Sequence, residues 1–160
     1  MIIVVAGVSG TGKSTIGKAI SEHLQLPFFD ADDFHPPSNI NKMQSGLALT
    51  DEDRWPWLEK LAALLAQYEK REGAVLACSA LKESYRRVLM RNGTLPVKWI
   101  MLTGSAELLA QRLSARKNHF FDGRLLATQL STLELPEYGL TVDVSDSVES
   151  IVTNALNYIR

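Results

Sequence analysis

Gly7-Val8-Ser9-Gly10-Thr11-Gly12-Lys13-Ser14 is the stretch that decides the fold of this 160-residue chain. It fits the phosphate-binding pattern G-x-x-x-x-G-K-[ST]. The β-branched run 2–6 before it indicates a buried strand, and the apolar residues after it recur at helical spacing through Leu24. A tight strand-to-helix turn can match the pattern by chance, but the flanking strand and helix favour a phosphate-binding loop (P-loop).

The residue types of this loop suit a bound nucleotide. Glycines let the chain curl so that successive backbone N–H groups point at one phosphate, and the helix that follows adds the positive end of its dipole. Lys13 can reach the β- and γ-phosphates, and the Ser14 hydroxyl can hold Mg²⁺. We therefore expect ATP and Mg²⁺ as cofactors, with nucleotide contacts from Gly7, Val8, Ser9, Gly10, Thr11, Gly12, Lys13, Ser14 and Thr15.

The composition indicates a single globular domain, residues 1–160, without an extended charged surface. Hydrophobic residues make up 46% of the chain, which is enough for a substantial core. The net charge of −1 argues against nucleic-acid and membrane partners. The single cysteine, Cys78, excludes an intramolecular disulfide and suits a reducing compartment. We expect a cytoplasmic protein, because no apolar run is long enough to span a bilayer.

An acidic segment follows the short apolar run at Phe28. Asp30, Asp32 and Asp33 lie within four residues, and their carboxylates repel one another unless a cation or hydrogen-bond donors compensate. A solvated acidic turn is one interpretation. A position at the end of a strand beside the P-loop favours a role at the site. The adjacent prolines at 36–37 argue against a helix over 30–37, and Ser38 is expected to cap a short helix through Met43.

The rest of the chain alternates between strands and helices. Strands are predicted at 2–6, 28–29, 74–78, 97–103 and 140–144, and helices at 13–24, 52–71, after 82, at 105–113, 124–134 and after a cap at Asp146. This alternation predicts an α/β fold, a five-stranded parallel sheet with helices on both faces. Right-handed crossovers bring the carboxyl ends of the strands to one edge. The P-loop, Asp30, Asp32 and the 79–82 segment are expected to meet there.

The third strand ends without the acidic residue that many P-loop enzymes use to hold Mg²⁺. It ends in Cys78-Ser79, so Asp30 and Asp32 are the candidates for that role. Cys78 itself is expected to be a small buried hydrophobe. Trp55 and Trp57 are expected to pack rather than to serve as stacking platforms.

A basic segment near residue 120 resembles a flap. Arg112 and Arg116 are four residues apart and share one helix face. The stretch 117–124 contains several basic residues and a closing glycine, which favours a mobile flap over the phosphates. An ordinary solvated face is the alternative.

Several blocks of sequence together resemble the gluconokinases, which are similar to the shikimate kinases. The resemblance covers nearly the whole chain. Besides the P-loop, it rests on Asp30-Ala31-Asp32-Asp33-Phe34-His35-Pro36, Asn39-Ile40-Asn41-Lys42-Met43, Asp51-Glu52-Asp53-Arg54-Trp55-Pro56-Trp57-Leu58, Ala77-Cys78-Ser79-Ala80-Leu81-Lys82-Glu83-Ser84-Tyr85-Arg86, His119-Phe120 and Leu133-Glu134-Leu135-Pro136. It implies transfer of the ATP γ-phosphate to the 6-hydroxyl of D-gluconate. It also implies the nucleoside-monophosphate-kinase-like fold with a substrate-binding loop at about 31–58, a lid at about 112–135, and a homodimer.

Gluconate is a polyol with one carboxylate, and these groups suggest a role for each candidate residue. Asp32 can accept hydrogen bonds from the hydroxyls and serve as general base, and by analogy with the shikimate kinases Asp30 orders Mg²⁺ together with Ser14. The carboxylate requires a planar cation, for which Arg54 and Arg86 are candidates. Further substrate contacts are expected from His35, Ser79, Lys82 and His119. Lys13 and Arg116 are expected to stabilise the transferring charge, and Arg112 to contact the nucleotide.

Two other functions remain open from the sequence. One is a kinase for another sugar acid, for shikimate or for a nucleotide. The other is a nucleotide-binding sensor without transfer activity. Acceptor-dependent release of ADP distinguishes these functions, because only a kinase releases ADP in response to its own acceptor.

Overall fold

The structure is a computed structural model that describes residues 1–115 and 125–160. Its centre is one five-stranded sheet in which all neighbouring strands run parallel, in the order β2-β3-β1-β4-β5. The strands are β1 (Ile2–Ala6), β2 (Phe28–Asp30), β3 (Ala74–Cys78), β4 (Val97–Thr103) and β5 (Leu140–Asp143). Every residue of β1 and β3 is buried, because these inner strands are covered on both faces.

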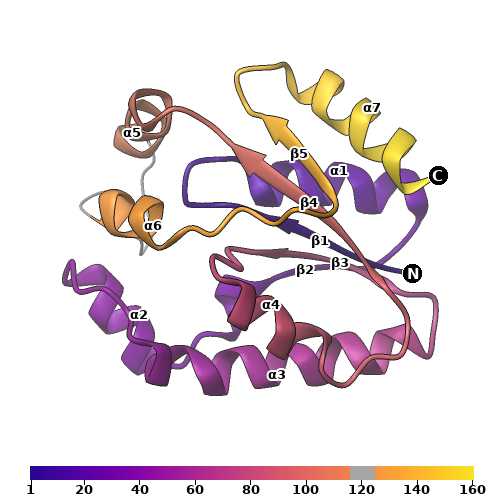
Figure 1. Cartoon of the computed structure of the whole chain (residues 1–160), viewed down its shortest axis with the longest axis horizontal. Coiled ribbons are helices and arrows are strands. Elements are labelled where there is room, and N and C mark those ends of the chain that lie inside the picture. Colours follow the sequence, from indigo (N-terminus) through magenta and orange to yellow (C-terminus); the bar gives the residue numbers. More distant parts are fainter. Residues whose placement is uncertain (116–124) are drawn as a thin grey trace.

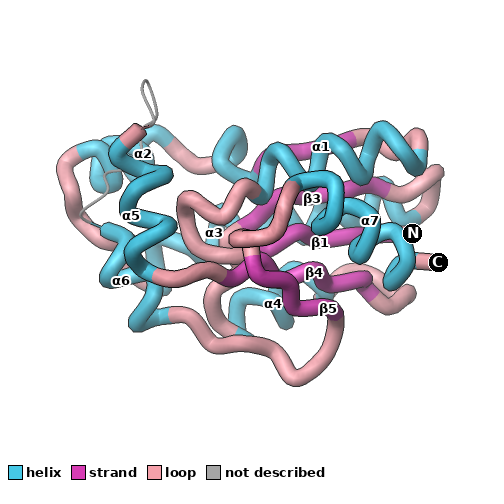
Figure 2. Tube along the Cα trace, turned by 90° about the horizontal axis from the view of Figure 1, so that it is seen from above, coloured by secondary structure: helices cyan, strands magenta, loops and turns pink. Residues whose placement is uncertain are grey.

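Helices cover both faces of the sheet, as the alternation of strands and helices predicts. Figure 1 shows α1 and α7 over one face and α3 and α4 over the other, while α2, α5 and α6 gather beyond the carboxyl ends of the strands. Figure 2 shows the same grouping from above, with both termini at the opposite end of the molecule. The bounds are α1 (Lys13–Leu24), α2 (Pro37–Gln44), α3 (Asp51–Glu69), α4 (Glu83–Met90), α5 (Ala106–Ser114), α6 (Leu126–Thr132) and α7 (Val148–Ile159). The predicted α/β fold is confirmed, and no helix in 1–115 or 125–160 is both long and apolar enough to cross a membrane.

Side-chain caps explain where several helices begin. Thr50 and Asp53 form a capping box at the start of α3, and Ser105 accepts from the Leu108 N–H at the start of α5. The prediction that Asp146 caps the last helix is wrong. Ser147 holds that position, and its hydroxyl accepts from the Ser150 N–H at 3.1 Å. Because α7 begins at Val148, Asp146 lies one residue too early to reach this amide.

The acidic segment and its prolines are more ordered than the sequence indicates. Residues Ala31–Phe34 form a single 3₁₀ turn, in which Asp30 is the cap and accepts from the Asp32 N–H. Helix α2 begins at Pro37 rather than after Ser38, because the first helical position needs no N–H donor. Helix α6 occupies 126–132, which is shorter than the predicted 124–134. These elements place the acidic segment and α6 on either side of the P-loop.

Candidate active site

The loop between β1 and α1 depends on glycine at two places. Gly12 has a φ of 88°, a left-handed conformation that turns the chain into α1. A Cβ on Gly7, at φ 147°, would lie 2.6 Å from the carbonyl oxygen of Leu102 on β4. The loop is therefore packed against the neighbouring strand, and the N–H groups at the start of α1 face the bend that it makes.

The peptide between Val8 and Ser9 is held from both sides. The Val8 carbonyl accepts from Thr11 Oγ1 at 2.8 Å and from Lys13 Nζ at 3.1 Å. The Ser9 N–H donates to Gln129 Oε1 of α6 at 2.8 Å. A residue 120 positions away in the chain thus fixes the rim of the P-loop.

A hydroxyl and a carboxylate meet where α1 begins beside β2. Ser14 Oγ donates to Asp30 Oδ2 at 2.6 Å, and Asp30 Oδ1 accepts from the Asp32 N–H at 3.0 Å. Both Ser14 and Asp30 offer hard oxygen ligands, the type that Mg²⁺ prefers. Residues 1–115 and 125–160 contain no cluster of three or more His, Cys, Asp or Glu that could hold a metal alone. The pair therefore fits a Mg²⁺ that takes its other ligands from phosphates and water.

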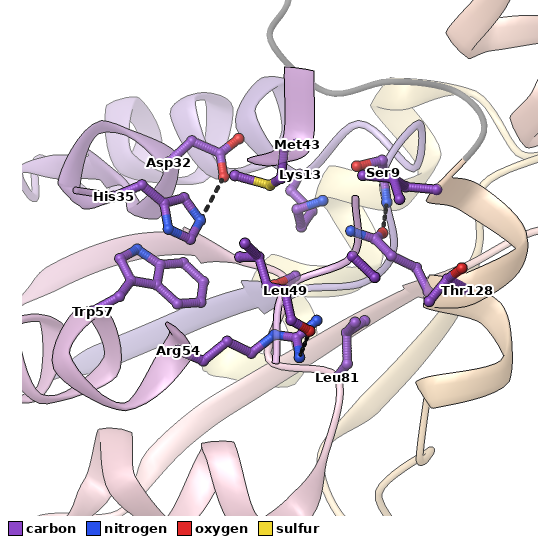
Figure 3. Close-up of a pocket in the computed structure, with 14 residues that line it drawn as sticks. Ser9, Lys13, Asp32, His35, Met43, Leu49, Arg54, Trp57, Leu81 and Thr128 are labelled. Carbon is purple, nitrogen blue, oxygen red and sulfur yellow. Dashed lines mark hydrogen bonds and ion pairs between the residues drawn. The ribbon is translucent and has the colours of Figure 1, made fainter. Parts of the chain in front are cut away.

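Two cavities open at the carboxyl edge of the sheet and share Ser9, Lys13 and Asp32. The P-loop cavity is lined by these three and by Gly10, Gly12, Ser14, Thr15, Asp30, Ala77, Cys78 and Arg112. The side cavity, drawn in Figure 3, is lined by the same three and by His35, Met43, Ala48, Leu49, Arg54, Trp57, Ser79, Leu81, Leu125, Thr128 and Gln129. Lys13 and Asp32 thus lie where the two cavities adjoin.

His35 forms one wall of the side cavity as a neutral ring. It stacks on the buried Trp57, with ring centroids 4.0 Å apart, and its Nδ1 lies 3.3 Å from Asn39 Nδ2. Burial, and after it the charge of Arg54, lower the pKa of His35 from 6.5 to about 4. The ring nitrogen Nε2 lies 4.0 Å from Asp32 Oδ1 (Figure 3). At neutral pH His35 therefore presents an uncharged imidazole to the cavity.

Arg54 brings a positive charge to the opposite wall. Its Nη1 donates to the Leu49 carbonyl at 2.8 Å and to Tyr85 Oη at 3.0 Å, and Figure 3 shows the guanidinium below Leu49. The Tyr85 hydroxyl donates to Asp51 at 2.5 Å. Burial, and then the bond to Asp51, raise the pKa of Tyr85 to about 12. The phenol therefore stays protonated and holds Arg54 in one orientation.

Arg86 does not line either cavity, so the prediction that it binds a substrate carboxylate needs correction. Its side chain is 1% exposed. Nη1 donates to the Ala80 carbonyl and Nη2 to the Glu134 carbonyl, both at 2.8 Å, while Nε donates to Glu83 and to the Tyr138 hydroxyl at 3.1 Å. Each nitrogen of this guanidinium bonds to a neighbouring segment of the chain, and the side chain is too deeply buried to reach a ligand in either cavity.

The other predicted residues are placed as follows. Ser79 lines the side cavity. Lys82 lies outside the lining residues and pairs with Asp51 at 3.6 Å. Arg112 lines the P-loop cavity while it donates to the Val144 and Gly10 carbonyls, at 2.8 and 3.4 Å. Arg116, His119 and the part of the expected lid at 116–124 lie outside the described residues.

Several lining residues of the side cavity carry no recognisable signal in the sequence. Gln129 is an amide on a helix of seven residues, and Met43 and Leu49 look like ordinary core residues. Trp57 was expected to pack, and it does, with its indole N–H donating to the Ala31 carbonyl at 2.7 Å. The sequence gives one hint of its stack with His35: both rings belong to blocks that carry the resemblance, 30–36 and 51–58.

The comparisons with known proteins agree with this geometry. Residues 9–145 match the sequence profile of the family described as shikimate kinase. A probable gluconokinase of Dictyostelium discoideum is 43% identical, and the match covers 100% of this chain and 86% of that protein. The thermoresistant gluconokinase of Escherichia coli is 39% identical over 99% of this chain and 93% of its own length.

Solved structures support the same assignment. The crystal structure of a gluconokinase from Sinorhizobium meliloti superimposes with a TM-score of 0.89 at 45% identity, and it covers 99% of this chain and 90% of that one. The shikimate kinase of Aquifex aeolicus shares the fold, with a TM-score of 0.55 at 20% identity over 99% of this chain and 96% of that one. Fold, P-loop and full-length identity lead to one conclusion: the chain belongs to the gluconokinase family.

Proposed function

We propose that this chain transfers the γ-phosphate of ATP to the 6-hydroxyl of D-gluconate, giving 6-phosphogluconate and ADP. One observation carries the proposal: Ser9, Lys13 and Asp32 line both the P-loop cavity and the side cavity. A phosphate held by the loop and an acceptor in the side cavity would meet at these three residues. The gluconokinase names of full-length relatives indicate which acceptor to test.

The transfer step needs a base and a cation at this junction. The acceptor oxygen attacks the γ-phosphorus as the bond to the β,γ-bridging oxygen breaks, so ADP leaves and the hydroxyl proton must go elsewhere. Asp32 is our candidate for accepting that proton, because its half-exposed carboxylate lines both cavities. Lys13 is our candidate for stabilising charge on the transferring group.

Acceptor binding would use both walls of the side cavity. The guanidinium of Arg54 suits the gluconate carboxylate, and neutral His35 with the Ser79 hydroxyl suits the polyol. The apolar remainder, Met43, Leu49 and Trp57, would cover the C–H face of the carbon chain and exclude water. Ser14 and Asp30 would hold Mg²⁺, which when bound neutralises charge on the β- and γ-phosphates.

The deciding experiment measures ADP release with Mg-ATP across gluconate, its epimers, shikimate and nucleoside monophosphates. We expect turnover with gluconate above all other acceptors. Turnover with a different acceptor, and none with gluconate, would leave the proposed phosphoryl transfer in place and show that gluconate is not the substrate. Tight ATP binding with no acceptor-dependent ADP release would identify a sensor and reject the proposal.

The assignment of Asp32 has a matched control in the next residue. Asp32→Asn removes the proposed base, so we expect kcat to fall by at least about a hundredfold. Asp33→Asn makes the same change on an exposed carboxylate that lines neither cavity, and activity should stay near the wild-type value. A near-normal kcat for Asp32→Asn would remove Asp32 as the base.

We also infer a homodimer, which rests on the family resemblance alone. Light scattering coupled to size-exclusion chromatography measures it directly. A monomer across the working concentration range would refute this inference without affecting the proposed reaction.

A further inference from the structure

We propose that Gln129 is a positioning residue for the nucleotide, although it lies in the side cavity. It acts through the peptide between Val8 and Ser9, whose orientation it fixes from the N–H side. The inference rests on the nucleotide half of the proposed function and needs no particular acceptor.

The argument starts from the two edges of this peptide. The Val8 carbonyl is held by Thr11 Oγ1 at 2.8 Å and Lys13 Nζ at 3.1 Å. The Ser9 N–H is held by Gln129 Oε1 at 2.8 Å (Figure 3 draws this bond at Ser9). The carbonyl and the N–H of one peptide point in opposite directions, so these contacts prevent its rotation.

Lys13 makes this orientation matter for phosphate binding. An ammonium group that turns toward phosphates gives up part of its contact with the Val8 carbonyl. Thr11, itself 1% exposed, and Gln129 then remain to hold the peptide. If the peptide rotated, its carbonyl oxygen could turn toward the bound phosphates and repel them. Gln129 therefore keeps the loop in its binding form before the nucleotide arrives, which lowers the ordering cost of binding.

The position of Gln129 also connects the two cavities. Helix α6 contributes Gln129 and Thr128 to the side cavity, and the one bond from Gln129 reaches the rim of the P-loop. Within residues 1–115 and 125–160, Gln129 Nε2 has no hydrogen-bond partner, so the contact to the loop is made by Oε1 alone. A substitution that removes Oε1 therefore tests this contact and no second one.

The test is an equilibrium titration with ATP in the absence of any acceptor, comparing wild type with Gln129→Met. Methionine keeps the length and loses the acceptor oxygen. We expect the Kd for ATP to rise about three- to tenfold, the range for one lost neutral hydrogen bond. Gln67→Met makes the same change at an exposed position of α3 and should leave the Kd unchanged.

A second readout separates positioning from general stability. Amide hydrogen exchange at Ser9 should accelerate in Gln129→Met while the thermal midpoint stays within a few degrees of wild type. If Gln129→Met does not fold, Gln129→Asn keeps a polar side chain that is one methylene too short to reach Ser9. An unchanged or tighter ATP Kd in a folded variant overturns the proposal. A failure to phosphorylate gluconate bears on the acceptor only, and leaves this test intact.

Discussion

Among single residues, Arg54 is our candidate for binding an anionic acceptor. Its Nη1 makes both of its structural bonds, to Leu49 and Tyr85. Within the described ranges, 1–115 and 125–160, Nε and Nη2 have no hydrogen-bond partner. These two nitrogens form one edge of the guanidinium fork, which can bind a carboxylate through two parallel bonds. The structure thus holds Nη1 of Arg54 in place, and we propose that the edge formed by Nε and Nη2 binds the acceptor carboxylate.

Replacing Arg54 by lysine keeps the positive charge but removes the two parallel N–H donors of the guanidinium. We expect the KM for gluconate to rise about tenfold, while the KM for ATP stays within about twofold. Arg87→Lys, a change on an arginine side chain that is 77% exposed, is the matched control. A rise in the KM for ATP alone would place Arg54 at the nucleotide instead.

The sequence predicts the residues of the site whose chemistry is local. The P-loop, Asp30 and Asp32 each lie within a few residues of a recognisable pattern, and the structure brings them together. Arg86 was assigned wrongly because an arginine in a motif looks the same whether its guanidinium faces a cavity or the core. Gln129 was missed because its bond to Ser9 spans 120 positions and depends on how α6 packs.

Among the elements, α4 and the segment after α6 are tied together through Arg86. Its guanidinium bonds join the turn at Ala80 to the carbonyl of Glu134. Two further bonds connect the same segments: Glu134 N–H to the Leu81 carbonyl at 2.8 Å, and Glu83 N–H to the Glu134 carboxylate at 2.9 Å. Ala80 has a φ of 41°, a left-handed conformation that costs free energy in a residue other than glycine. The bond from Arg86 to its carbonyl helps to keep this turn beside the side cavity.

Removing this buried arginine should destabilise the whole chain. Arg86→Met leaves two carbonyls without their donor, so we expect the free energy of unfolding to fall by about 2–4 kcal/mol. Chemical denaturation measures it. Arg87→Met, on the adjacent exposed residue, should change stability by less than about 0.5 kcal/mol. Equal effects for the two variants would contradict the role of Arg86 as a structural link.

Elements were predicted best where burial is continuous. The strands at 2–6 and 74–78 have the predicted bounds because fully apolar runs admit few other structures. Helix ends were predicted less accurately, because one residue decides which side chain reaches an amide, as Ser147 and Asp146 show. The lid expected at about 112–135 stays a prediction, because residues 116–124 lie outside the described residues.

For the whole molecule, burial of His35 couples stability to pH. Its pKa is 6.5 in the unfolded chain and about 4 in the fold. Between these values the unfolded chain binds a proton that the folded chain does not, so the free energy of unfolding decreases as the pH falls from 6.5 toward 4. The full decrease from this one ring is about 3 kcal/mol.

Denaturation of wild type and His35→Gln between pH 7 and pH 4 measures this coupling. We expect the variant to lose less stability over that range than wild type. His23→Gln, on an exposed ring of α1, should keep the wild-type pH dependence. A wild-type slope in His35→Gln would mean that other groups cause the acid sensitivity.

The single thiol of the chain can be used to measure how often the structure around it opens or unfolds. Cys78 is 1% exposed at the end of β3, and burial raises its pKa to about 12. An alkylating reagent at neutral pH should therefore react only with molecules that have opened, and no second cysteine among the 160 residues contributes signal. If ATP binds only the closed form, about 100 Kd of ATP should slow alkylation about a hundredfold. Alkylation at the rate of a free thiol, with or without nucleotide, would show that β3 does not shield this sulfur.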